Sequence, residues 1–154
     1  MTIRNFIFVG LLTAFTSASL ASNCSPLVAK IIEKTNATFE RATQGGENVF
    51  LKHSDASSFS MHCGLLGPDI YVSWTGKNGA FPSNNFFTLV ANASSVLTGR
   101  SANKIDISLH ECHAKAIKAG LELAEIHKDG VGIECQSFKR DGGGTAFTVY
   151  MDKK

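Results

Sequence analysis

Four cysteines in a chain of 154 residues are the feature that most constrains its fold, because disulfide bonds fix which segments must lie together. They are Cys24, Cys63, Cys112 and Cys135. An even number of cysteines in an exported protein is typical of disulfides, and four cysteines allow three pairings. Their positions in the helices and strands predicted below favour Cys24–Cys63 and Cys112–Cys135.

The N-terminus predicts that the chain is exported. Arg4 supplies a positive charge, residues 6–15 form an apolar run, and Ser19 and Ala21 are small side chains where signal peptidase requires them. The apolar run is half the roughly 20 residues that are needed to cross a bilayer. We therefore predict a signal peptide over residues 1–21, cleaved after Ala21, and a single exported domain over residues 22–154.

The charge of the predicted mature chain is close to neutral. Removal of residues 1–21 takes away one basic side chain, Arg4, and leaves 14 basic against 13 acidic residues. Such a chain has no long-range field to attract nucleic acid or anionic lipid. We expect a secreted or periplasmic protein with no nucleic-acid partner and no membrane attachment after signal cleavage.

Three segments have the apolar spacing of helices. Ser25 and Pro26 are typical of a helix start, and the stripe that follows continues to Phe39, so the first helix is predicted to run to the glycines at 45 and 46. The second is predicted from Ser83 to the glycine at 99. The third is predicted from Ser101 or Asn103 to the glycine at 120.

Six segments alternate between apolar and polar residues, as strands do. Cys63 and Cys135 lie on the apolar faces of two of them, Cys112 lies in the apolar stripe of the third helix, and Asp129-Gly130 predicts a tight hairpin turn. The pattern predicts an α+β fold: a five- or six-stranded antiparallel sheet with about three helices on one face, stapled by disulfides. The two strand groups are expected to pair side by side. The predicted strands cover residues 49–51, 58–63, 70–74, 121–127, 131–138 and 145–151.

The sequence His110-Glu111-Cys112-His113 is the strongest candidate for chemistry. His110 and His113 lie on neighbouring helix surface and could share a metal ion, but the spacing differs from H-E-x-x-H and no C-x-x-C accompanies it. A disulfide at Cys112 would remove a third ligand. We therefore predict no metal, cofactor or catalytic residue, and the alternative function is an exported metal-dependent or hydrolytic enzyme that uses His110 and His113.

Large apolar side chains near loops indicate recognition instead. Leu66 lies at a predicted turn, and Trp74 and Phe81 flank a glycine-rich loop. Exposed aromatic side chains often mark a partner surface, although Trp74 and Phe81 could also cap the end of the core. The sequence thus favours a small secreted or periplasmic protein-binding domain without enzymatic activity, of inhibitor, immunity or adaptor type. The identity of its protein partner stays open.

Overall fold

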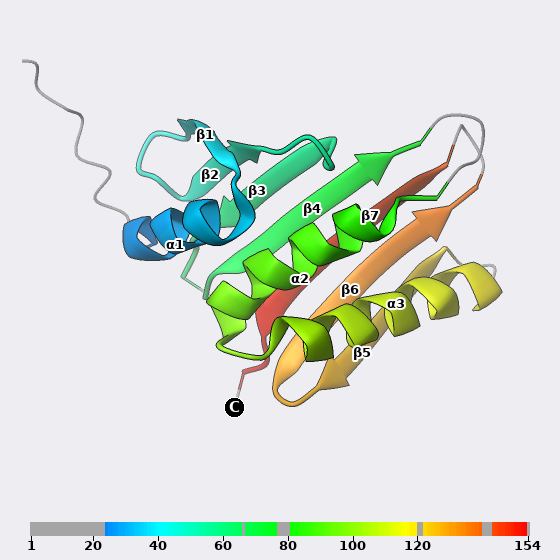
Figure 1. Ribbon diagram of the computed structural model, residues 1–154. Helices are drawn as coiled ribbons and strands as arrows, with labels where there is room; N and C mark the ends of the chain where they lie inside the picture. The colour runs from blue at the N-terminus through cyan, green and yellow to red at the C-terminus, as the bar shows by residue number, and fades with distance from the viewer. Residues whose placement is uncertain (1–23, 66, 77–80, 120–121, 140–142, 154) are drawn as a thin grey trace, which may run out of the picture.

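A computed structural model describes residues 24–65, 67–76, 81–119, 122–139 and 143–153. The predicted signal peptide and Leu66 lie outside these ranges. Within them the chain forms an antiparallel sheet with helices on one face (Figure 1). The helices are α1 (Ser25–Thr35), α2 (Asn84–Thr98) and α3 (Ala102–Ala119). The strands are β1 (Thr38–Ala42), β2 (Asn48–Lys52), β3 (Ser58–His62), β4 (Asp69–Thr75), β5 (Leu123–Lys128), β6 (Val131–Phe138) and β7 (Gly144–Met151).

The sheet has seven strands in the described residues, so the prediction of five or six strands was wrong. The extra strand is β1, which lies where the first helix was predicted to continue. Instead, α1 ends at Thr35, and Asn36 adopts a left-handed conformation with a φ of 58°. The Thr35 hydroxyl donates to the carbonyl of Ile31 at 2.7 Å, which closes the last turn. Phe39, assigned to the buried stripe of that helix, is 48% exposed on β1.

The two strand groups lie side by side, as predicted, because β4 pairs with β7 along its whole length. The order across the sheet is β1-β2-β3-β4-β7-β6-β5. The turn between β5 and β6 contains Asp129 and Gly130, both with positive φ angles (53° and 79°), which confirms the predicted hairpin. The sheet is therefore two antiparallel meanders joined through their last strands.

The core lies between the helices and one face of the sheet. In Figure 1, α2 runs along β4 and β7, and α3 lies over β5 and β6; both helices contact these strands, and α1 packs against α2. Strand residues on this face are buried, whereas their neighbours, such as Tyr71 and Glu134, are exposed on the opposite face. An antiparallel sheet with one solvated face is common, and we call this second face the open face. The largest fully buried side chains include Phe59, Phe86, Phe147, Ile31, Met61 and Ile70.

Two disulfides staple this arrangement, and their pairing confirms the prediction. Cys24, at the N-cap of α1, is bonded to Cys63, which follows β3. Cys112 on α3 is bonded to Cys135 on β6. Both pairs have a Cα–Cα distance of 6.1 Å. None of the helices in the described part of the chain is both long and apolar enough to span a bilayer.

Candidate functional site

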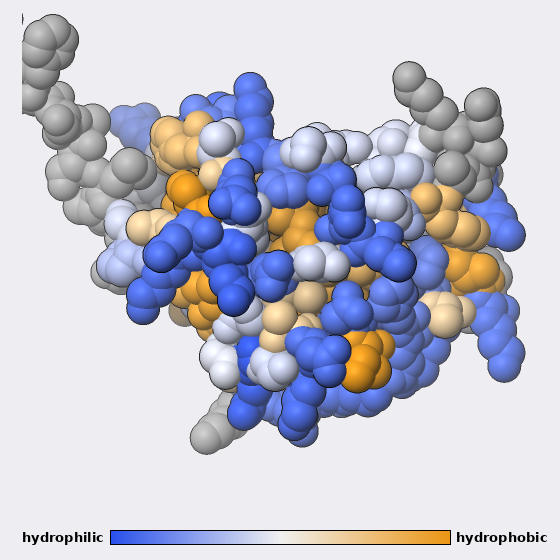
Figure 2. All heavy atoms as spheres, viewed as in Figure 1, coloured by the Kyte–Doolittle hydropathy of each residue, from blue (hydrophilic) through white to orange (hydrophobic). Residues whose placement is uncertain are grey.

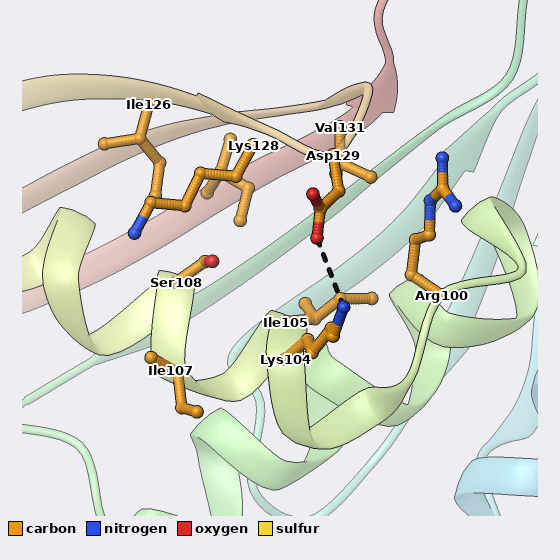
Figure 3. A pocket seen from close by; sticks show the side chains of 10 residues that line it. Arg100, Lys104, Ile105, Ile107, Ser108, Ile126, Lys128, Asp129 and Val131 are labelled. Atoms are coloured by element: carbon orange, nitrogen blue, oxygen red, sulfur yellow. Dashed lines mark ion pairs between the residues drawn. The ribbon is translucent and has the colours of Figure 1, made fainter.

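A pocket opens between α3 and the hairpin formed by β5 and β6 (Figure 3). It has a volume of about 220 Å³. Its floor consists of four buried apolar side chains that come from all three elements: Ile105, Ile126, Val131 and Ile133. We call this the α3 pocket. It exists because the apolar stripe of α3 and the inward faces of β5 and β6 meet without a larger side chain to fill the gap near the hairpin turn.

The mouth of the α3 pocket is lined by charged side chains. Lys104 of α3 and Asp129 of the hairpin turn form an ion pair across it, with 3.5 Å between Nζ and Oδ2 (dashed in Figure 3). Lys128 forms an ion pair with Glu111 on α3. Lys115 forms a second ion pair with the same carboxylate, with 3.2 Å between Nζ and Oε1. These two ammonium groups lower the pKa of Glu111.

Arg100 is the remaining cation at the mouth. It lies in the connection between α2 and α3, directly after Gly99, whose left-handed φ of 67° ends α2. Among the described residues no carboxylate forms an ion pair with its guanidinium. That group lies beside the hairpin turn, since a Cβ on Gly130 would be 3.7 Å from Nη2. The mouth therefore presents an available guanidinium next to an apolar floor.

The rim of the α3 pocket carries one exposed apolar side chain. Ile107 lines the pocket and is 57% exposed, and Ser108, which is buried, places the hydroxyl of its side chain in the wall. Figure 2 shows an apolar patch over α3 surrounded by hydrophilic side chains. Apolar pockets of about 300–1,000 Å³ hold drug-sized ligands, so a pocket of about 220 Å³ is better matched to one large side chain.

His110 lies on α3 outside the pocket and packs against α2. Its ring stacks on that of Phe87, with 4.0 Å between centroids, and its Nε2 is 3.8 Å from Oδ2 of Asp106. Stacking and the neighbouring carboxylate account for the position of this ring. The described residues include no group of three or more His, Cys, Asp or Glu side chains arranged to hold a metal ion.

His113 faces β6 instead of an open surface. Its Nδ1 is 2.7 Å from the hydroxyl of Ser137, which is fully buried. Its ring packs edge-on against the ring of Phe81, with 5.1 Å between the ring centroids. Burial lowers the pKa of His113, and the charge of His110 lowers it further. The environment of His113 therefore favours its neutral form, which hydrogen-bonds with the hydroxyl of Ser137.

The predicted partner surface is only partly described. Trp74 extends from the inward face of β4, is half-buried and packs against the core. Phe81 is 37% exposed, and the ammonium of Lys139 lies 5.2 Å from its ring centroid. These contacts agree with the interpretation of Trp74 as a cap on the core. A partner surface at Trp74, Phe81 and Leu66 stays a prediction.

A cluster of ionisable side chains lies on the open face. Nδ1 of His127 lies 2.8 Å from Oδ1 of Asp152, and Nε2 lies 3.0 Å from Oε1 of Glu125. The hydroxyl of Tyr150 donates a hydrogen bond to the same Oε1 of Glu125 at 2.6 Å. The bond to Asp152 is the main cause that raises the pKa of His127. Burial raises the pKa of Tyr150, and so does its bond to Glu125. The cluster links the end of β7 to β5 through the His127–Asp152 ion pair and the Tyr150–Glu125 hydrogen bond.

The sequence did not reveal the α3 pocket. One signal was present, because Ile107 follows Asp106 and lies out of phase with the apolar stripe of Ile105 and Leu109. An apolar residue at that position must face away from the core, so its exposure could have been anticipated. The other pocket residues gave no such signal, since their buried positions are those of any core side chain.

Comparisons with known proteins give no relative for this chain. No protein-family model matches it, and no curated protein or solved structure is significantly similar to it.

Proposed function

We propose that the chain is a small secreted or periplasmic protein-binding domain without enzymatic activity, of inhibitor, immunity or adaptor type. In this proposal the α3 pocket receives one large apolar side chain of a partner protein. The observation that carries it is a pocket of about 220 Å³ with an apolar floor, a charged mouth and the exposed Ile107 on its rim. An apolar pocket surrounded by polar groups is a form that binding hot spots take.

The disulfides support the export part of the proposal. Both bonds are formed in the structure, and disulfides persist in secreted and periplasmic proteins, whereas the cytosol keeps thiols reduced. The Cys112–Cys135 bond joins α3 to β6, the two elements that form opposite walls of the α3 pocket. A pocket whose walls are covalently joined is held open before a partner arrives, which lowers the entropic cost of binding.

The alternative, an exported enzyme using His110 and His113, has less support. Each ring already packs on a phenylalanine, and His113 also binds the buried Ser137. Metal analysis of the purified protein distinguishes the two functions. Stoichiometric zinc that disappears in the H110A/H113A double variant would favour the enzyme.

Site-specific crosslinking tests the proposed contact site. The photoreactive residue benzoylphenylalanine would replace Ile107 in cells that export the protein, and illumination would follow. The control places the same residue at Leu123, which has nearly the same exposure, 61% against 57%, but lies on the open face. The captured partner would be identified, purified and bound again to the unmodified protein.

We expect a crosslinked partner from position 107 and none from position 123. The purified partner should bind the wild-type protein with defined stoichiometry. The same adducts from both positions would indicate non-specific contact and would contradict the proposal. A partner captured only at position 123 would move the binding surface to the open face.

A further inference from the structure

We infer that the side chain received by the α3 pocket is flanked by carboxylates, so that the partner presents an apolar residue within an acidic segment. This inference rests on the proposed function and names the chemistry of the partner. It is carried by the charges around the pocket mouth and by the position of Arg100 among them.

The mouth carries an excess of positive charge. Three cationic side chains line it, namely Arg100, Lys104 and Lys128, against one lining carboxylate, that of Asp129. Lys128 also forms an ion pair with Glu111 on α3. Each carboxylate is already held by at least one ammonium group of the chain. The predicted mature chain as a whole is nearly neutral, so this local excess is a property of the site. A segment that docks here meets a positive rim.

Arg100 determines where an acidic group would bind. Its guanidinium has no carboxylate partner in the described residues and lies at the hairpin end of the mouth. A guanidinium offers a planar pair of donors that matches a carboxylate, and exposed donors of this kind recognise acidic groups. A partner carboxylate next to the buried anchor would bind Arg100 without displacing an existing ion pair.

A basic segment would fit the same mouth poorly. It would place its cations beside Arg100 and Lys104, and the carboxylate that lines the mouth, Asp129, is already paired with Lys104. Like charges brought together at an interface suppress the wrong partner. The charges around the α3 pocket therefore discriminate between acidic and basic partner segments, while the apolar floor supplies most of the contact area.

The isoleucines of the chain provide a direct readout. Four of them, Ile105, Ile107, Ile126 and Ile133, line the α3 pocket, and Ile31 and Ile70 are buried elsewhere in the core. Selective ¹³C labelling of the isoleucine methyl groups allows NMR titration of the pocket together with internal controls. The probes are three peptides with a central phenylalanine, capped at both ends, whose two neighbours on each side are all glutamate, all lysine or all glutamine.

We expect the glutamate-flanked peptide to shift the four pocket methyl groups and to leave those of Ile31 and Ile70 unchanged. Its affinity should exceed that of the lysine-flanked peptide by about tenfold or more. In the R100E variant the ratio of the affinity for the glutamate-flanked peptide to that for the lysine-flanked peptide should fall at least about fivefold, because the charge at position 100 is reversed. K30E, a charge reversal on the exposed surface of α1, is the control and should leave the preference unchanged.

The outcomes separate the inference from the proposed function. Equal binding of all three peptides at the pocket methyl groups would overturn the acidic-segment inference and leave the apolar pocket intact. A preference for the lysine-flanked peptide, or a preference unaffected by R100E, would overturn it as well. If no peptide shifts the pocket methyl groups, the pocket does not receive an apolar side chain, and the proposed function fails with the inference.

Discussion

Removal of the Cys112–Cys135 disulfide should destabilise the domain and loosen the α3 pocket together. Cys112 on α3 and Cys135 on β6 are both buried, and each sulfur lies 3.5 Å from the carbonyl oxygen of Ala124 on β5. The bond therefore joins the helix to the hairpin at the point where both pack on the same backbone. Replacing both cysteines by alanine, in C112A/C135A, removes this link and leaves only small voids.

The size of the effect follows from the length of the closed loop. The two cysteines are 23 residues apart in sequence, and the loss of loop entropy in the unfolded chain gives about 3.5 kcal/mol at 25 °C. The Cys24–Cys63 bond spans 39 residues and should contribute about 4 kcal/mol, since the dependence on loop length is logarithmic. Small domains have a total stability of about 5–15 kcal/mol, so either loss is a large fraction.

Urea denaturation measures this difference. Trp74 is the single tryptophan of the chain and is half-buried against the core, so its fluorescence reports unfolding. We expect C112A/C135A to unfold with a free energy about 3–4 kcal/mol below that of the wild type, and C24A/C63A, the matched control, to fall by a similar amount. A loss below about 1 kcal/mol in C112A/C135A would refute the argument from loop closure.

Three further substitutions test other parts of the structure. Burial lowers the pKa of His113 in the folded state, so protonation of this ring opposes folding. The free energy of unfolding should therefore fall as the pH drops through the ordinary histidine pKa of about 6.5. In urea titrations at pH 5 and 8, H113Q should show a smaller difference in the free energy of unfolding between the two pH values than the wild type does. The ring of Tyr150 covers Gly132, so G132A must displace this ring and should cost up to about 1 kcal/mol in thermal denaturation, whereas a raised Tm would contradict the packing. Within the described part of the chain the buried hydroxyl of Ser94 has no hydrogen-bond partner, so S94A should be neutral or stabilising by up to about 1 kcal/mol, and a clear loss of stability would show that the hydroxyl is satisfied.

Local patterns were enough to predict most of this fold. Strand β3 alternates strictly, with Phe59 and Met61 buried and their neighbours exposed or partly exposed, and the Asp129-Gly130 turn has a strong sequence signal. Cys112 lies in the apolar stripe of α3, and Cys135 lies on the apolar face of β6. Both side chains were therefore expected to point into the same core, which is why their pairing could be predicted. Each of these inferences depends on a few neighbouring residues.

Strand β1 was missed because two patterns compete over the same residues. Phe39 continues the helical spacing of Ile31 and Ile32, but Asn36 can adopt the left-handed conformation that ends a helix. Thr38 and Phe39 favour a strand once the edge of β2 is available for pairing. The outcome was decided by a partner strand that lies beyond a turn, and helical periodicity does not include that partner.

The α3 pocket could not be predicted for a related reason. Its floor combines Ile105 with residues of β5 and β6, and its mouth depends on where the α2–α3 connection places Arg100. No short segment contains this arrangement. The predicted surface at Trp74 and Phe81 was based on large side chains near a loop, and the alternative interpretation, that these side chains cap the end of the core, agrees with the packing of Trp74.

The most direct test of the proposed function is the dissociation constant of the crosslinked partner for two variants, measured by isothermal titration calorimetry. S108L places a larger apolar side chain in the wall of the α3 pocket, and A114L adds the same side chain at an exposed position of the same helix. We predict that S108L weakens binding by about tenfold or more, since a filled pocket cannot receive the anchor, and that A114L binds as the wild type does. Unchanged affinity in a folded S108L variant would contradict the assignment of the α3 pocket as the binding site.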